Sequence, residues 1–439
     1  MVLDDRPEAP MMCDLELQFQ GSLDATAFAS ALEFSLGRNP LFTCRIEYQR
    51  GGLVWIPTDW RPLVDWAPWG APLDDRYGVR VDLQREPGLR IWVRQGEERS
   101  TILLHFHHAC SDAMGMFGFI EDLLAGYASA TPGSSPVTPR PLAPERLLTR
   151  GDAGVSGRSL PRRIHDVIVG MHEGIKFFWK APAPLACARC LPDPADAPPV
   201  RPSFLVVTIS EPVTLELRRK ATASKVMLND LLLRELFLVL RRWNAVQGST
   251  DSRWLRILMP QNLREDADGP MPAANMVAFA FLTRTCRQCD EPDALLASIR
   301  AETEAVRRGR LSMYLLGGMG TMLSAGLLPW LLRRSFCFAT VVMTNLSDPT
   351  RRFIAKFPRS PQGLVVGNVV FQGLSGVPPL RPGTRAAFGI STSISTFSIS
   401  LRWDPRCFSL LDAQRLLGEY VSQLHVTAEG SETELQPAS

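Results

Sequence analysis

The sequence of 439 residues has little net charge and no dense set of cysteines. Its 48 Lys and Arg residues and 45 Asp and Glu residues leave a formal charge of +3, which is too balanced for the basic surface that nucleic-acid backbones require. The nine cysteines are an odd number spread along a long chain, whereas disulfide-rich secreted scaffolds are short and carry a dense, even set. We therefore expect reduced thiols and no nucleic-acid partner.

Several motifs that would define a function class are missing. No GxxxxGK[ST] phosphate loop occurs, no GxGxxG opens a helix after a strand, and the GxSxG elbow of hydrolases is absent. Residues 1–20 carry charged side chains before any apolar run, so we expect no secretory signal and a cytoplasmic location. With 45% hydrophobic and 21% charged residues, the composition is that of a globular protein.

A long uncharged run covers residues 313–332 (MYLLGGMGTMLSAGLLPWLL) and is followed by Arg333 and Arg334. Four glycines, two hydroxyl residues and Pro329 dilute its apolar character, and no second run of this kind exists to pack against it. A buried helix, or a surface-lying helix in peripheral contact with a membrane, is therefore favoured over a membrane span.

Two CxxC spacings, Cys187/Cys190 and Cys286/Cys289, resemble zinc knuckles. They lie far apart in the sequence, and the first stands in a stretch rich in proline and alanine, with no turn glycine or nearby histidine. We expect incidental cysteines and no metal.

Proline is dense in residues 181–203, which predicts an extended linker between an N-terminal lobe, 1–180, and a C-terminal lobe, 204–439. In both lobes, short apolar runs alternate with segments of helical periodicity, so the expected class is mixed α/β. The expected strands cover 15–20, 42–48, 89–93, 101–106, 204–209, 255–259, 276–282 and 388–403. The expected helices cover 24–39, 116–127, 213–223, 229–243 and 410–424.

The chain has only six histidines, and His105, His107 and His108 lie together at the end of one expected strand. A neutral imidazole can take a proton from an alcohol, amine or thiol, so His108 is a candidate general base. Asp112, four residues later, could bond this imidazole or pair with a basic residue elsewhere and brace the turn. A metal site is disfavoured, because adjacent histidines on a strand point to opposite faces.

The run from His107 to Asp112 matches the HHxxxD core of the HHxxxDG motif, and further stretches follow in the expected order. These stretches are 38–42 (RNPLF), 226–233 (VMLNDLLL), 259–264 (MPQNLR), 274–277 (ANMV), 344–347 (TNLS) and 403–417. Over nearly its whole length the sequence resembles the chloramphenicol acetyltransferase-like superfamily. That superfamily includes condensation domains of nonribosomal peptide synthetases, wax ester synthase/diacylglycerol acyltransferases, polyketide-associated acyltransferases and BAHD acyltransferases.

The resemblance implies two chloramphenicol-acetyltransferase-like α/β lobes in a V with a central tunnel. It implies His108 as the base, His107 beside it and Asp112 as its structural partner. The expected reaction moves an acyl group from a thioester, on acyl-CoA or on the phosphopantetheine of a carrier protein, to a hydroxyl or an amine, with no bound cofactor. Thr344, Asn345 and Ser395 are candidates for contacts with the substrate or the oxyanion.

The sequence departs from the motif at Ala113, where the superfamily has glycine. An alanine there would be strained if the backbone had a positive φ. A second hypothesis is therefore a catalytically silent binding module that docks a carrier protein or another partner, and a third is a carrier-dependent condensation or epimerisation enzyme. The DFGWG motif of BAHD proteins is absent, whereas Asn229-Asp230 and the run 313–332 fit the wax ester synthase side.

Overall fold

The computed structural model describes residues 1–50, 52–150, 168, 172, 174–187, 204–248, 254–309, 326, 336–346, 348, 353, 355–392 and 396–430. The chain forms two compact units. Unit 1 comprises Met1–Gly157, Asn262–Val277 and Leu346–Pro379, and unit 2 comprises Arg158–Gln261, Ala278–Asn345 and Leu380–Ser439. The expected mixed α/β class is confirmed.

This division differs from the expected lobes 1–180 and 204–439, because two later segments belong to unit 1. One of them contains β13 (Val369–Val377), which pairs antiparallel with β1 (Met12–Gln20). Such a pairing depends on residues far apart in the sequence, and the local composition that marks a linker carries no information about it. Of the expected linker, residues 181–187 lie in the described part and have no regular secondary structure.

Unit 1 is built on a seven-stranded sheet in the order β11-β12-β13-β1-β6-β5-β4. Its central strand, β1, pairs antiparallel with β13 on one side and with β6 on the other. The remaining strands of the sheet are β11 (Arg359–Ser360), β12 (Gly363–Val366), β6 (Arg99–His107), β5 (Leu89–Gln95) and β4 (Leu63–Pro68). A separate hairpin consists of β2 (Cys44–Gln49) and β3 (Gly52–Pro57).

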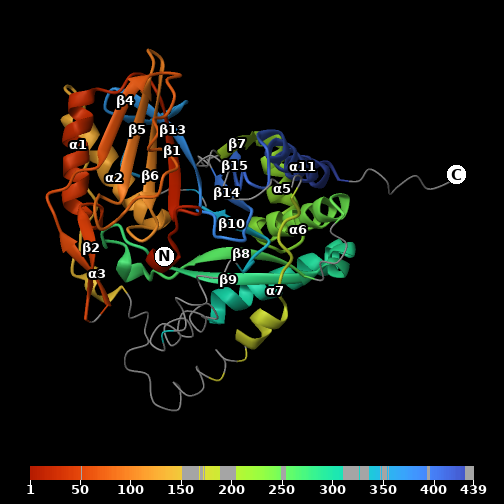
Figure 1. Cartoon of the computed structure of the whole chain (residues 1–439). Coiled ribbons are helices and arrows are strands. Elements are labelled where there is room, and N and C mark those ends of the chain that lie inside the picture. The colour runs from red at the N-terminus through yellow and green to blue at the C-terminus, as the bar shows by residue number, and fades with distance from the viewer. Residues whose placement is uncertain are drawn as a thin grey trace. The chain divides into compact units, whose positions relative to one another are not determined.

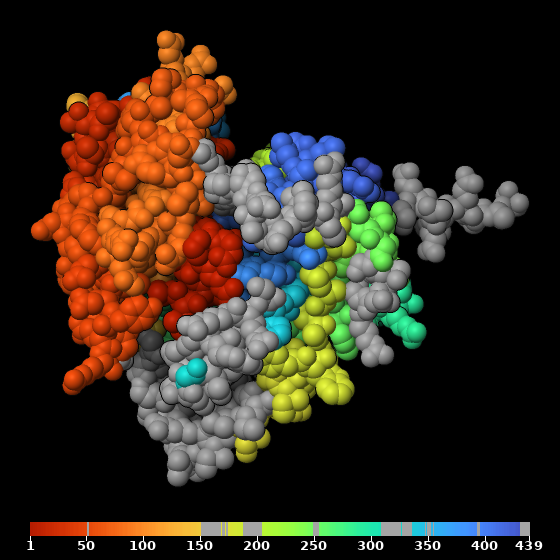
Figure 2. All heavy atoms as spheres, viewed as in Figure 1, coloured from red at the N-terminus to blue at the C-terminus, as the bar shows by residue number. Residues whose placement is uncertain are grey.

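Helices α1 (Ala25–Arg38) and α2 (Ala113–Ala130) lie side by side in unit 1 and bury their apolar residues in the same core as the strands (Figure 1). Asp24 begins α1 as predicted, because its side chain accepts a hydrogen bond from the amide of Ala27 at 2.7 Å. In Figure 2 the residues coloured red to orange, which belong to unit 1, form one continuous surface. Unit 1 also contains α3 (Arg146–Thr149) and short 3₁₀ turns at Val2–Asp4, Pro40–Phe42 and Asp266–Asp268.

Unit 2 has a six-stranded sheet in the order β7-β15-β14-β10-β8-β9. The strands are β7 (Phe204–Ile209), β15 (Phe397–Trp403), β14 (Ala386–Thr392), β10 (Val341–Asn345), β8 (Trp254–Asn262) and β9 (Val277–Thr285). The described part of unit 2 also contains the helices α5 (Glu211–Ala223), α6 (Leu228–Val246), α7 (Pro292–Gly309) and α11 (Leu410–Glu429) and the 3₁₀ turn Cys286–Asp290. Alternate residues of β14 and β15 share a core with α11, where the rings of Phe388 and Tyr420 lie 5.5 Å apart.

The run 388–403 was expected as one strand and is two, β14 and β15, paired antiparallel as a hairpin. Ser/Thr and apolar residues alternate in the same way whether a segment forms one long strand or two consecutive strands. The pattern alone therefore did not reveal that the chain changes direction between β14 and β15. The uncharged run 313–332 lies, apart from Gly326, outside the described residues. Within the described parts of the chain, no helix is long and apolar enough to cross a membrane.

Candidate active site

The HHxxxD run forms the turn between β6 and α2. The strand ends at His107, and the helix begins at Ala113 with Asp112 as its N-cap. The amide of Cys110 donates to the carbonyl of His107 at 2.9 Å, and the amide of His108 donates to the carbonyl of Met11 at 2.8 Å. Backbone hydrogen bonds therefore hold the His108 main chain at the end of the sheet.

Asp112 is buried and accepts hydrogen bonds on both carboxylate oxygens. Its Oδ1 accepts from the amide of Gly115 at 2.8 Å, which caps α2. Its Oδ2 accepts from the amide of Met276 at 2.7 Å and from Nη1 of Arg264 at 2.8 Å. Of the two roles considered from sequence, the geometry matches the pairing with a distant basic residue that braces the turn.

Arg264 and Met276 lie in the segment 262–277 of unit 1, which contacts the first turn of α2 very closely. The amide of Asp112 donates to the carbonyl of Ala274 at 3.2 Å, and Nη2 of Arg264 donates to the same carbonyl at 2.7 Å. A Cβ added at Gly115 would lie 2.7 Å from that carbonyl oxygen and 2.8 Å from the Ala274 amide nitrogen. Glycine at 115 is therefore required for the close approach of this backbone.

The imidazole of His108 is held through one ring nitrogen. Its Nδ1 lies 3.1 Å from the carbonyl oxygen of Ser111, which can only accept, so Nδ1 carries the proton of this hydrogen bond. In the described part of the chain, the hydrogen-bond contacts of this ring all involve Nδ1 and none involves Nε2. Burial lowers the pKa of His108, and the nearby charge of Asp112 opposes this shift only in part. At neutral pH the ring is uncharged, with a lone pair on Nε2.

Asn275 lies beside the same imidazole. Its Oδ1 accepts from the amide of Val277 at 3.1 Å, which identifies the other end of the amide group as Nδ2. That Nδ2 donates to the carbonyl of His108 at 2.6 Å and lies 3.0 Å from the ring Nδ1. Since the carbonyl of His108 is the closer acceptor, this contact is compatible with a proton on Nδ1. Asn275 thus bonds the backbone of His108 and lies against its ring.

His107 has both ring nitrogens occupied. Its Nδ1 accepts from the amide of Ala109 at 3.0 Å, and its Nε2 lies 3.4 Å from a carboxylate oxygen of Asp5. Burial lowers the pKa of His107 despite the opposing effect of Asp5. The ring therefore links the turn to the N-terminal residues. His105 contacts a different carboxylate, that of Asp14.

Ala113 occupies the first position of α2 and does not have a positive φ. The strain considered for an alanine at this position is therefore absent, and the argument that it impairs the turn falls away. The thiol of Cys110, within the motif, is buried, and burial raises its pKa, so it is not a thiolate at neutral pH.

The expected substrate and oxyanion residues lie in unit 2. Thr344 and Asn345 are adjacent on β10 and therefore point to opposite faces of the sheet. Nδ2 of Asn345 donates to Oδ1 of Asn229 in α6 at 3.0 Å, so Asn345 lies on the helix-covered face and Thr344 on the other. Ser395 and Cys190 are outside the described residues. Within the described part of the chain, no group of His, Cys, Asp and Glu side chains is placed to hold a metal ion.

Reasoning from the sequence did not assign a role to Arg264 or Asn275. Both stand in the stretches MPQNLR and ANMV that carried the resemblance, and this was the available signal. Their approach to His108 and Asp112 requires the segment 262–277 to belong to unit 1.

Comparison with solved structures places this turn in a known fold. SgcC5 from Streptomyces globisporus superimposes with a TM-score of 0.65 at 14% identity, covering 97% of this chain and 94% of that protein. The first condensation domain of the CDA synthetase gives a TM-score of 0.64 at 14% identity, over 97% and 92% of the two chains. The starter condensation domain of rhizomide synthetase, a mutant in complex with C8-CoA, gives a TM-score of 0.66 at 13% identity, over 97% and 91%.

The chain has the condensation-domain fold. The similarity to condensation domains expected from the sequence is thereby confirmed for the fold over nearly the whole chain. No protein-family model matches the sequence, and no curated protein matches it. The HHxxxD run of this condensation-like chain forms the β6–α2 turn, with Asp112 capping the helix.

Proposed function

We propose that the protein is an acyltransferase that moves an acyl group from a thioester to a hydroxyl or an amine. The single observation that carries this proposal is the His108 imidazole, which is uncharged and whose hydrogen-bond contacts among the described residues involve Nδ1 and leave Nε2 available. A base with this geometry can accept the proton of an attacking nucleophile. The similarity to a starter condensation domain in complex with C8-CoA supports a thioester donor.

In the proposed reaction, the acceptor oxygen or nitrogen attacks the thioester carbonyl and gives its proton to Nε2 of His108. The tetrahedral intermediate collapses, the carbon–sulfur bond breaks, and the imidazolium returns the proton to the leaving thiolate. The products are an ester or an amide and a free thiol. His107 and Asp112 act as positioning residues, because their side chains bond to Asp5 and to Arg264.

We also propose a hydrogen-bond donor for the oxyanion of the tetrahedral intermediate. Thr344 is the candidate we retain from unit 2, since its hydroxyl lies on the sheet face that α6 does not cover, whereas the amide of Asn345 bonds to Asn229. A hydrogen-bond donor aimed at the developing oxyanion lowers the activation free energy of such reactions by about 3 to 4 kcal/mol. The Thr344→Val variant keeps the shape of the side chain and should lower kcat without changing the fold.

The test is turnover by the purified chain. Acyl-CoA of several chain lengths is incubated with a panel of alcohols and amines, and parallel reactions contain acyl groups loaded on a carrier protein. Free thiol and the acylated product are measured by chromatography and mass spectrometry. We expect thiol release that His108→Ala abolishes, and His425→Ala, a change in α11, is the matched control. Turnover that survives in His108→Ala refutes the mechanism, and an absence of turnover with both donor types favours the silent binding module.

A further inference from the structure

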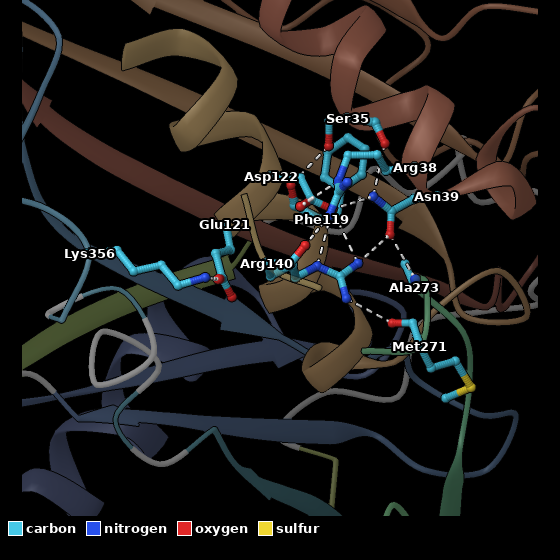
Figure 3. A network of polar contacts seen from close by, with 10 residues as sticks. All are labelled: Ser35, Arg38, Asn39, Phe119, Glu121, Asp122, Arg140, Met271, Ala273 and Lys356. Carbon is cyan, nitrogen blue, oxygen red and sulfur yellow. Dashed lines mark hydrogen bonds and ion pairs between the residues drawn. The ribbon is translucent and has the colours of Figure 1, made fainter. Parts of the chain in front are cut away.

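A buried polar network in unit 1 surrounds Arg140 (Figure 3). Its side chain contacts Asp122 on α2, with Nη2 and Oδ2 3.1 Å apart. The same carboxylate accepts from Nε of Arg38 at 2.9 Å and from Nδ2 of Asn39 at 3.0 Å. The side chain of Asp122 is fully buried, so its charge depends on these donors.

The network also holds the backbone of residues 271–276, which we call the 271–276 strap. Nη1 of Arg140 donates to the carbonyl of Met271 at 2.9 Å, and Oδ1 of Asn39 accepts from the amide of Ala273 at 2.8 Å. Nη2 of Arg140 donates to that same Oδ1 at 3.2 Å, which orients the Asn39 amide group. Two residues after Ala273 the strap presents Asn275 to His108.

Glycines on α2 make room for this arrangement. A Cβ added at Gly118 would lie 3.2 Å from Cζ of Arg140, and Gly115 allows the close approach of Ala274. Gly115, Gly118 and Asp122 are three and four residues apart and therefore lie along one face of the helix. Along this face, Gly115 leaves room for Ala274 of the strap, Gly118 leaves room for Arg140, and Asp122 pairs with Arg140.

We propose that Arg140, together with Asn39, is a positioning residue for His108. It acts by fixing the 271–276 strap, so that Asn275 meets the carbonyl and the ring of His108. An effect of Arg140 on turnover can be measured only if the protein catalyses the proposed acyl transfer. Its effects on the position of the strap and on the His108 imidazole do not depend on that proposal. The competing explanation is that the network only stabilises unit 1.

The variant Arg140→Met tests the proposal, because Asp122 keeps Arg38 and Asn39 as partners and the protein should fold. Arg140→Lys is the second variant, since it keeps the charge but loses the planar fork that reaches Met271 and Asn39 together. The matched control is Lys356→Met. Lys356 pairs with the buried Glu121, the neighbour of Asp122 on α2, and Figure 3 draws no hydrogen bond or ion pair from either side chain to Met271 or Ala273 of the strap.

Amide hydrogen exchange of the strap and the NMR titration midpoint of the His108 ring are measured in each variant, alongside the thermal unfolding temperature. We expect both Met variants to lower the unfolding temperature. Arg140→Met alone should speed exchange of the strap by about 10-fold or more and move the His108 midpoint. In an active enzyme it should also lower kcat by about 10- to 100-fold, with a smaller change in KM.

Equal exchange of the strap and equal His108 midpoints in Arg140→Met and Lys356→Met would overturn the proposal, leaving a purely stabilising network. If the wild-type chain transfers no acyl group, the proposed function fails, while exchange and titration still decide whether Arg140 positions the strap. If Arg140→Met does not fold, the same comparison is made with Arg140→Lys.

Discussion

Removal of the Asp112 carboxylate should destabilise the protein through the loss of a helix cap and of an ion pair, and it also leaves the amide of Met276 without its acceptor. The cap on the Gly115 amide disappears, which costs about 1 kcal/mol. The Arg264 guanidinium, with its side chain only 11% exposed, loses its ion-pair partner, which costs about 3 to 5 kcal/mol for a buried pair. The cap and the ion pair alone therefore give an expected loss of at least about 4 to 6 kcal/mol in the free energy of unfolding of the Asp112→Ala variant.

A double-mutant cycle with Arg264→Met separates the ion pair from the cap. The double variant no longer contains an unpaired buried cation, so it should be more stable than the sum of the single changes predicts, by about 1.5 to 3 kcal/mol. Urea denaturation followed by tryptophan fluorescence provides the four free energies. The pair Arg146 and Asp268, 3.2 Å apart and more exposed, is the control, and its coupling should stay below about 1 kcal/mol.

The reasoning fails if the Asp112 and Arg264 changes are additive within about 0.5 kcal/mol. It also fails if Asp112→Ala costs no more than the loss of a helix cap. Either result would mean that the ion pair does not brace the turn that carries His108.

Three further predictions concern the same turn. Burial lowers the pKa values of His107 and His108 below 6.5, so below that pH the unfolded chain binds more protons than the folded protein. The free energy of unfolding should therefore fall on acidification from pH 6.5, by up to about 1.4 kcal/mol per pH unit for each ring. Urea denaturation between pH 7.5 and 5.5 should show this slope, and a His108→Gln variant with an unchanged slope would contradict it. Gly115→Ala should lower the free energy of unfolding by about 1 to 3 kcal/mol, because the added Cβ would meet the Ala274 backbone. Gly37→Ala is the control: the space around Gly37 in α1 is open, so this change should raise the free energy of unfolding by about 0.5 to 1 kcal/mol. Equal shifts of the thermal unfolding temperature in the two variants would contradict the packing argument. Asn275→Leu removes the donor to the His108 carbonyl and should lower kcat by about 10- to 100-fold in a folded protein, and an unchanged kcat would show that this contact is dispensable.

Local patterns in the sequence predicted most of the elements around the site. Alternation and helical periodicity placed β6, α2 and the turn between them, and the N-cap of α1 was expected at Asp24. These signals depend on residues within a few positions of one another, which is why they can be recognised in a single sequence. The run 388–403 shows their limit, because alternation does not reveal where a strand reverses.

The residue types of the HHxxxD run by themselves determined that an imidazole and a carboxylate stand at the end of a strand, four positions apart. They left open whether Asp112 would bond His108 or a distant cation. Tertiary structure decided this, by bringing Arg264 and Asn275 to the turn on a segment that belongs to unit 1. It also joined Asn39 and Arg140 to that segment through a buried network. Burial and backbone contacts between residues more than 100 positions apart select these partners, and no local pattern encodes them.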